Sequence, residues 1–151
     1  MKDEELARLR LRRQHLTGTP LATPEAVVGW LGAVQAQEFG VAKWSIARRS
    51  RGRVTSADLD RALAEGRILR THALRSTWHF VLPADLRWLL MLIGPRVRAR
   101  MASYSWQNGL TDAVFARSQA VLREALGGGR QLLRKEVVAA LARGRVATDG
   151  L

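Results

Sequence analysis

Hydrophobic residues near the start of the chain recur at helical spacing. Over 4–15, leucines alternate with arginines, which predicts a helix with one strongly basic face. Thr23 then stands as an N-cap before Pro24, and valines and leucines follow at helical spacing as far as Val34. We therefore predict a second helix that begins at Pro24 and ends near Val34.

The next segment carries two short helices and then changes to strand periodicity. Helices are predicted over 41–49 and, with Ser56 as the cap, up to Gly66. Residues 68–72 and 77–82 alternate polar and apolar side chains with period two, which predicts a β-hairpin. Helices followed by a two-stranded ribbon are the order of a winged helix. We predict a mainly α fold with a small β-hairpin, a winged helix-turn-helix.

The second half of the chain is predicted to be helical. A helix that begins at Pro83 has too many apolar residues for one surface stripe, so we expect it to be buried between domains, with Pro95 interrupting it. Two later helices, 111–126 and 133–142, are joined through a run of glycines, which favours a helix-turn-helix unit. The predicted parts are a first winged-helix domain at 1–83, connecting helices at 84–109 and an incomplete second winged-helix domain at 110–151. This organisation is a tandem winged-helix architecture truncated in its second domain.

Composition adds a class of partner to this picture of a helical, folded chain. The 151 residues are 47% hydrophobic, and 25 Lys and Arg against 13 Asp and Glu give a net charge of +12. A codon bias explains the preference for Arg over Lys but does not explain the excess of positive charge. The charge indicates a polyanion, and nucleic acid is the leading candidate.

Several classes of site and location are disfavoured by the sequence. The chain has no cysteine, which excludes disulfides, a thiolate nucleophile and a cysteine zinc site. The glycines at 127–129 lack the Lys-Ser/Thr sequel of a phosphate-binding loop, and His72 and His79 have no neighbouring ligand pattern, so we expect no metal and no cofactor. The apolar run 88–93 is far shorter than a membrane span, and the N-terminus has no signal-peptide core. We expect a cytoplasmic protein without membrane contact, and no protein partner is inferable.

The segment Gln35-Ala36-Gln37 is the strongest candidate for chemistry. Residues two apart point away from each other in a helix but lie on one face in extended backbone. We expect the pair in or near the terminal turn of the helix that begins at Pro24, where a departure from helical geometry brings both amides to one side. Without further context, the pair is better explained as a polar helix end that satisfies backbone groups.

A wider order of residues resembles a known family. The segments are Arg10-x-x-Arg13-Gln14-x-Leu16, Ala33-Val34-Gln35-Ala36-Gln37, Trp44-Ser45, Leu69-Arg70-Thr71, Arg75-Ser76-Thr77-Trp78-His79-Phe80-Val81 and Asp85-Leu86-Arg87-Trp88-Leu89. This order resembles the N-terminal portion of the AlkZ-like winged-helix DNA glycosylases. The resemblance implies a bacterial protein, associated with the nucleoid when bound to DNA, from a family of tandem winged-helix enzymes usually more than twice this length. Such enzymes excise alkylated bases and unhook interstrand crosslinks.

The resemblance also implies catalytic residues and a reaction. Gln35, Ala36 and Gln37 match the catalytic motif of the family position by position, whereas a related branch has aspartate in place of the second glutamine. A glutamine amide accepts and donates hydrogen bonds without taking a proton, so two of them can place a water. An alkylated purine such as N7-methylguanine is cationic and leaves readily, so a monofunctional glycosylase needs little more than a positioned water. Glu38 stays open between base work and a surface acid.

Basic and aromatic residues supply the candidates for DNA contact. Most tryptophans are expected in the core, with Trp44 as the exception. The predicted DNA-binding residues are Arg12, Arg13, Lys43, Trp44, Arg48, Arg49, Arg51, Arg53, Arg70, Arg75 and His79.

Two classes of function remain open from the sequence. The first is a DNA glycosylase that hydrolyses the N-glycosidic bond of damaged bases, or a part of one. The second is a non-catalytic winged-helix DNA-binding protein or regulator, or an inactive fragment of the glycosylase. A glycosylase leaves an abasic site that alkali cleaves, and a binder leaves the strand intact.

Overall fold

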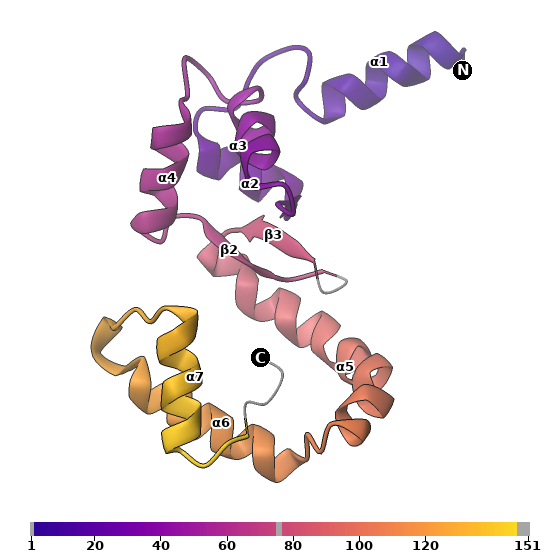
Figure 1. Cartoon of the computed structure of the whole chain (residues 1–151). Helices are drawn as coiled ribbons and strands as arrows, with labels where there is room; N and C mark the ends of the chain where they lie inside the picture. Colours follow the sequence, from indigo (N-terminus) through magenta and orange to yellow (C-terminus); the bar gives the residue numbers. More distant parts are fainter. Residues whose placement is uncertain (1, 75–76, 148–151) are drawn as a thin grey trace. The chain divides into compact units, whose positions relative to one another are not determined.

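The computed structural model describes residues 2–74 and 77–147, which form two compact units, Met1–Arg98 and Ala99–Leu151 (Figure 1). Both units are mainly helical, and the first also contains a small antiparallel sheet, so the predicted mainly α class is confirmed. The predicted domain limits at residues 83 and 109 stay a prediction.

Four helices precede the hairpin in the first unit. The predicted cap at Thr23 is confirmed, because its side chain accepts a hydrogen bond from the backbone N–H of Ala26 at 3.1 Å. The predicted extension of this helix to Val34 is wrong, since Gly32 adopts a φ of 73° and turns the chain away at the C-terminus. The helices are α1 (Asp3–Arg13), α2 (Pro24–Leu31), α3 (Phe39–Ala47) and α4 (Ser56–Ala64).

The starts of α3 and α4 differ from the prediction. Helix α3 begins at Phe39, before the predicted start at residue 41. The cap of α4 is Thr55 and not Ser56, because the Thr55 hydroxyl accepts from the backbone N–H of Asp58 while the Asp58 carboxylate accepts from the backbone N–H of Thr55. This reciprocal capping box satisfies two backbone donors that would otherwise be unpaired.

The sheet has one strand more than predicted. Strands β2 (Leu69–His72) and β3 (Trp78–Val81) form the predicted hairpin, and a two-residue strand, β1 (Val34–Gln35), pairs with the other edge of β3. All pairings among these strands are antiparallel, and the order across the sheet is β1-β3-β2. The helices and this sheet are consistent with a winged-helix-like fold.

The two faces of the sheet pack against different helices. Val34 and Phe80 are register partners, and both are buried in a core with residues of α2, α3 and α4. Val81, the next residue of β3, points to the opposite face and packs with Leu89 of the following helix, α5 (Pro83–Gln107). The first unit therefore has a main core on one face of the sheet and a smaller one on the other.

Helix α5 is longer than predicted. It runs for 25 residues through Pro95, so the predicted interruption is wrong. Proline removes one hydrogen bond and crowds the residue before it, and that residue is Gly94, which has no Cβ to clash. Along this helix Leu89 is buried while Met91 is 71% exposed, and the expected burial between domains stays a prediction. No helix in the described parts of the chain is long and apolar enough to cross a membrane.

The tryptophans are more exposed than predicted. Trp44 is exposed, as expected, but Trp30, Trp88 and Trp106 are exposed as well, so the core prediction is wrong for these three. Trp106 is 84% exposed near the end of α5. Apolar stripes at helical spacing indicate a helix face but do not reveal whether another element covers it.

The second unit contains a packed pair of helices. Helix α6 (Asp112–Ala125) is capped by Thr111, whose side chain accepts from the N–H of Val114. A 3-10 turn, η1 (Gly127–Gly129), leads toward α7 (Arg134–Arg143), which packs against α6. The predicted helices and their glycine-containing connection are confirmed.

Candidate active site around Gln35 and Gln37

The two glutamines lie on one exposed face of an extended segment. Burial alternates along the segment: Val34 is 8% exposed and Ala36 is fully buried, whereas Gln35 and Gln37 are both exposed. Alternation with period two is the signature of extended backbone. The expected place in the terminal turn of α2 is therefore wrong, because that helix ends at Leu31 and β3 recruits the segment as a strand.

After β1 the regular hydrogen bonding between strands is interrupted, and side chains take part in holding the segment. The N–H of Ala36 donates to the carbonyl of Trp78 at 2.7 Å. The carbonyl of Ala36 accepts from Nε and Nη2 of Arg70, at 3.2 and 2.9 Å. The N–H of Trp78 donates to Oε1 of Gln37 at 3.4 Å. One backbone hydrogen bond, from Trp78 to Ala36, is thus missing. Arg70 binds its acceptor, and Gln37 binds its donor.

Aromatic rings surround the guanidinium of Arg70. Its central carbon lies 4.6 Å from the ring centre of Trp78 and 5.2 Å from that of Phe39. Phe39 is also in contact with the ammonium of Lys43, at 4.5 Å, and with the ring of Phe80. Cations over aromatic faces are stabilised by the ring quadrupole, so Arg70 is held in place on several sides.

His79 lies directly across the sheet from Gln35. The two residues are register partners of β1 and β3, and His79 is 4% exposed. Its Nδ1 is 2.8 Å from the carbonyl oxygen of Thr77, which only accepts hydrogen bonds, so we assign the ring proton to Nδ1. In the neutral ring Nε2 is then an acceptor. A DNA contact of His79 stays a prediction, and it would have to be made by a buried ring.

Both amides keep groups that can bind a small polar molecule. The side chain of Gln35 forms no hydrogen bond with any other residue that the structure describes. The Oε1 of Gln37 accepts from the N–H of Trp78, and its NH₂ group donates to no other residue that the structure describes. The pair offers donors and an acceptor without any charge, which suits binding a water and not removing its proton.

No stronger chemistry is visible beside the pair. Glu38 is exposed as the N-cap residue of α3, where its side chain makes no capping bond. Within residues 2–74 and 77–147, no three His, Asp or Glu side chains are grouped to hold a metal ion. The amide pair is therefore the feature from which a function has to be argued.

Two of the predicted DNA-binding cations are buried inside the first unit. The Lys43 ammonium donates to Ser56 at 2.6 Å and to both oxygens of Asp60, at 2.8 and 2.9 Å. Arg49 donates to the carbonyls of Gln14 and Ser45, at 2.8 and 2.7 Å, and burial lowers its pKa. The geometry argues against phosphate contacts for both, because each would first have to leave its protein partners.

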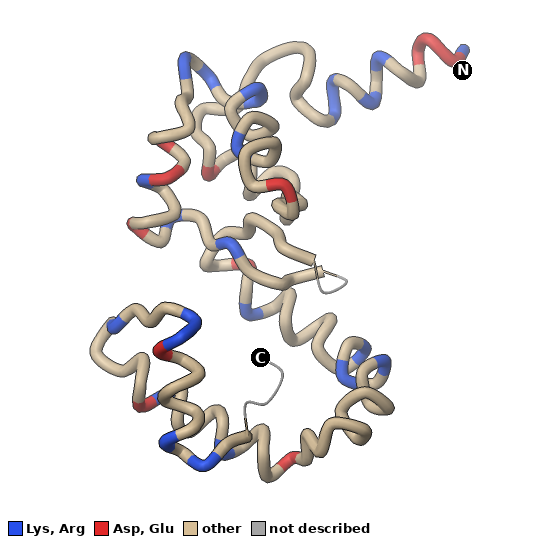
Figure 2. The backbone as a smooth tube through the Cα atoms, viewed as in Figure 1, with Lys and Arg blue, Asp and Glu red and all other residues tan. Residues whose placement is uncertain are grey.

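Most of the other predicted arginines are exposed, whereas Arg70 is half-buried. Arg48, Arg51 and Arg53 lie at the end of α3 and in the loop that follows, where basic positions gather in Figure 2. A parallel bridge between Leu21 and Ser50 ties this loop down. Arg12 and Arg13 are exposed on α1, Trp44 is exposed on α3, and Arg75 lies outside the described residues. DNA contact by this group stays a prediction.

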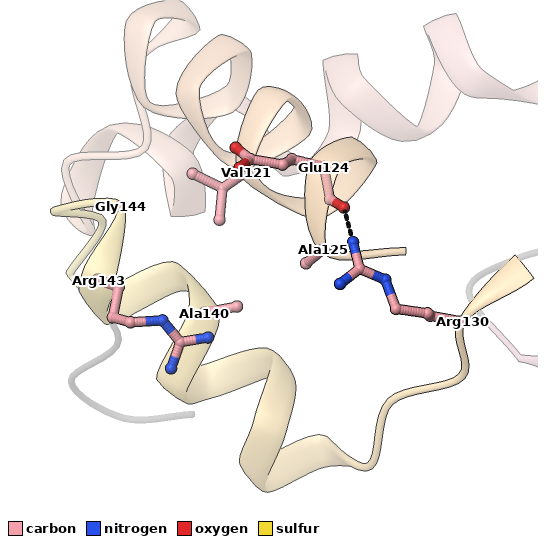
Figure 3. A pocket seen from close by; sticks show the side chains of 7 residues that line it. All are labelled: Val121, Glu124, Ala125, Arg130, Ala140, Arg143 and Gly144. Carbon is pink, nitrogen blue, oxygen red and sulfur yellow. Dashed lines mark hydrogen bonds between the residues drawn. The ribbon is translucent and has the colours of Figure 1, made fainter. Parts of the chain in front are cut away.

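A separate groove lies between α6 and α7 in the second unit (Figure 3). Its volume is about 330 Å³, and Arg130, Arg143 and Glu124 supply its charged groups. Arg130 donates to the backbone carbonyls of Gly127 and Glu124 and so closes the turn between the helices. Among the residues that the structure describes, no glutamine, asparagine or histidine lines this groove. Its residues therefore suit a structural role in connecting the two helices better than a role in a reaction.

Comparisons with known proteins agree on one family. The family model described as DNA glycosylase AlkZ-like matches residues 28–150. The solved structure of the Streptomyces sahachiroi DNA glycosylase AlkZ is similar, with a TM-score of 0.74 and 25% sequence identity. The match covers 93% of this chain and 39% of that structure. A search of curated proteins gave no match.

Proposed function

Because the chain belongs to the DNA glycosylase AlkZ-like family, we propose that it carries the water-directing site of a monofunctional DNA glycosylase. The proposed reaction is hydrolysis of the N-glycosidic bond of alkylated, cationic purines, including those joined in interstrand crosslinks. The observation that carries the proposal is the alternating burial from Val34 to Gln37, which presents both amides on one exposed face.

Two neutral amides suit this reaction. The oxygen of a bound water attacks the anomeric carbon of the sugar, and the electron pair of the N-glycosidic bond passes to the cationic base, which leaves neutral. The water releases its proton to solvent. Gln35 and Gln37 orient the water, and their carbonyl dipoles stabilise the oxocarbenium charge that develops on the sugar.

The proposed DNA-binding surface extends beyond the amide pair. The exposed arginines of the loop after α3 supply contacts to phosphates of damaged double-stranded DNA, and α1 supplies further positive charge. Helices α6 and α7 are proposed to begin a second winged helix, in a tandem arrangement. The chain spans 39% of the length of the AlkZ structure. The kind of lesion and the complete DNA-binding cleft are therefore proposed.

The test is release of a methylated base. DNA that contains N7-methylguanine is incubated with the chain, and the abasic sites are cleaved with alkali and counted. The double variant Gln35→Ala, Gln37→Ala is expected to lower the rate by about 100-fold or more. Gln119→Ala, an exposed glutamine of α6, is the matched control and keeps the wild-type rate.

The same experiment separates the enzyme from a binding protein. A wild-type chain that binds the methylated DNA and yields no alkali-labile sites supports a non-catalytic winged-helix protein. If the double variant releases the base at the wild-type rate, Gln35 and Gln37 take no part in the reaction.

A further inference from the structure

We propose that Arg70 is a positioning residue, which keeps Gln37 in its working place by occupying the carbonyl oxygen of Ala36. This inference rests on the proposed function of the glutamine pair. It differs from a DNA contact, because the action of Arg70 passes through the protein backbone and not through a phosphate.

The argument begins with the register of the sheet. Val34 pairs with Phe80 and Gln35 with His79, so the next residue, Ala36, stands opposite Trp78. In an antiparallel ladder, a hydrogen-bonded pair exchanges two N–H···O bonds. The bond from Ala36 to Trp78 is present at 2.7 Å, while the expected return bond, from the N–H of Trp78 to the carbonyl of Ala36, is replaced.

Arg70 takes the acceptor of that return bond. A carbonyl oxygen has two lone pairs, and two N–H groups of Arg70 converge on the oxygen of Ala36. Hydrogen bonds from a charged guanidinium are stronger than those from a neutral backbone N–H. The fork of Arg70 therefore displaces the N–H of Trp78 as the donor to this oxygen.

Gln37 takes the donor that is left over. The displaced N–H of Trp78 reaches Oε1 of Gln37 at 3.4 Å. This contact is long for a hydrogen bond, so it depends on there being no better acceptor nearby. Removing Arg70 would expose such an acceptor at Ala36. The N–H of Trp78 would turn to it, β1 would lengthen, and the amide of Gln37 would be released.

The surroundings of Arg70 favour arginine at this place. Its planar group lies near the rings of Phe39 and Trp78 while two of its N–H groups donate to one oxygen. A lysine ammonium is a point charge that supplies neither the fork nor the stacked plane. Arg70→Lys thus keeps the charge and loses the positioning, whereas Arg70→Met loses both.

The experiment compares these two variants in the full chain. Single-turnover release of N7-methylguanine is expected to fall by about 10- to 100-fold in both, with DNA affinity within about twofold of wild type. The carbonyl ¹³C signal of Ala36 and the amide signal of Trp78 are expected to shift in both variants without DNA present. Arg61→Lys and Arg61→Met, on the exposed side of α4, are matched controls with wild-type values.

Each contrary result has a distinct form. If Arg70→Lys keeps the wild-type rate and Arg70→Met weakens DNA binding, Arg70 is a phosphate contact and the proposal is wrong. Lower thermal stability with an unchanged rate in the folded protein would reduce Arg70 to a structural role. If the wild-type chain releases no base, the proposed function fails, and the Ala36 and Trp78 signals alone decide whether Arg70 holds the segment.

Discussion

The backbone N–H of Trp78 donates to the side chain of Gln37 at 3.4 Å, although a backbone carbonyl stands opposite it in the sheet. The backbone donor of Trp78 thus binds a side chain, Gln37, that takes part in the proposed reaction. The side chain of Gln37 is therefore hydrogen-bonded directly to the main chain of β3.

Replacing Gln37 should be visible in the exchange of the Trp78 amide hydrogen. Gln37→Leu removes the acceptor, and we expect exchange to become about tenfold faster, as for the loss of one hydrogen bond. Gln37→Glu retains an acceptor and should keep exchange near the wild-type rate. The measurement is hydrogen exchange followed residue by residue. Equal exchange in all three proteins would mean that the contact contributes nothing to the protection of this amide.

The exposed arginines should set the salt dependence of DNA binding. Neutralising Arg48, Arg51 and Arg53 is expected to reduce the slope of log affinity against log salt by about 0.9 for each phosphate that the protein no longer binds. Arg49→Gln should leave this slope unchanged and lower thermal stability, because its guanidinium is bound to Gln14 and Ser45. The measurement is a titration of duplex DNA at several salt concentrations. If Arg49→Gln changes the slope as much as neutralising an exposed arginine does, Arg49 contacts DNA phosphates.

The capping box of α4 should make stability depend on pH in the acid range. Hydrogen bonds from the hydroxyl and then the backbone N–H of Thr55 lower the pKa of the Asp58 carboxyl, with a further contribution from the charge of Arg61. Since the folded-state pKa lies below the unfolded one, the stabilisation is present above about pH 4 and is lost as pH falls through the folded value. We therefore expect wild type to melt at a higher temperature than Asp58→Asn near neutral pH.

The same comparison at acid pH supplies its control. The difference in melting temperature between wild type and Asp58→Asn should shrink as pH falls through the lowered pKa of the Asp58 carboxyl, where the wild-type side chain gains its proton. Asp112→Asn, at the start of α6, serves to show how much of the effect is common to any carboxylate in a first helical turn. A difference that stays constant from neutral to acid pH would exclude the linkage.

The contact between α6 and α7 should be sensitive to one added methyl group. A Cβ at Gly144 would overlap the Cγ2 methyl of Val121. We expect Gly144→Ala to destabilise the unit by about 1 to 3 kcal/mol through overpacking. The double variant Gly144→Ala, Val121→Ala should recover part of this loss, as measured by thermal or denaturant unfolding. Additive effects of the two changes would show that these side chains do not meet.

Local sequence signals were sufficient where one segment determined its own structure. Thr23 before Pro24 predicted the start of α2, and alternating residues predicted the hairpin of β2 and β3. These signals depend on backbone capping and on side-chain period, which act within a few residues. The resemblance to the family placed Gln35 and Gln37 together as a candidate site, and the structure shows that both are exposed.

The missed features depend on partners distant in the chain. Strand β1 has two residues, too few to show a period, and it exists because β3, far along the chain, offers it an edge. Lys43 and Arg49 belong to the densest positive segment, but burial against Asp60 and Gln14 cannot be deduced from their own neighbours in sequence. The signal that could have found Lys43 is the acidic side chain of Asp60 on α4, one of whose faces packs on α3.

The first helix has a practical consequence for handling the protein. Helix α1 buries no residue, and it contains Arg8, Arg10 and Arg12. A protease that cleaves after arginine needs a locally unfolded stretch of backbone, and an unsupported helix opens most easily. At Leu21 the backbone is hydrogen-bonded to the backbone of Arg49 and Arg51, which resists such opening. Limited digestion should therefore trim α1 from the first unit and leave the segment with Gln35 and Gln37 intact.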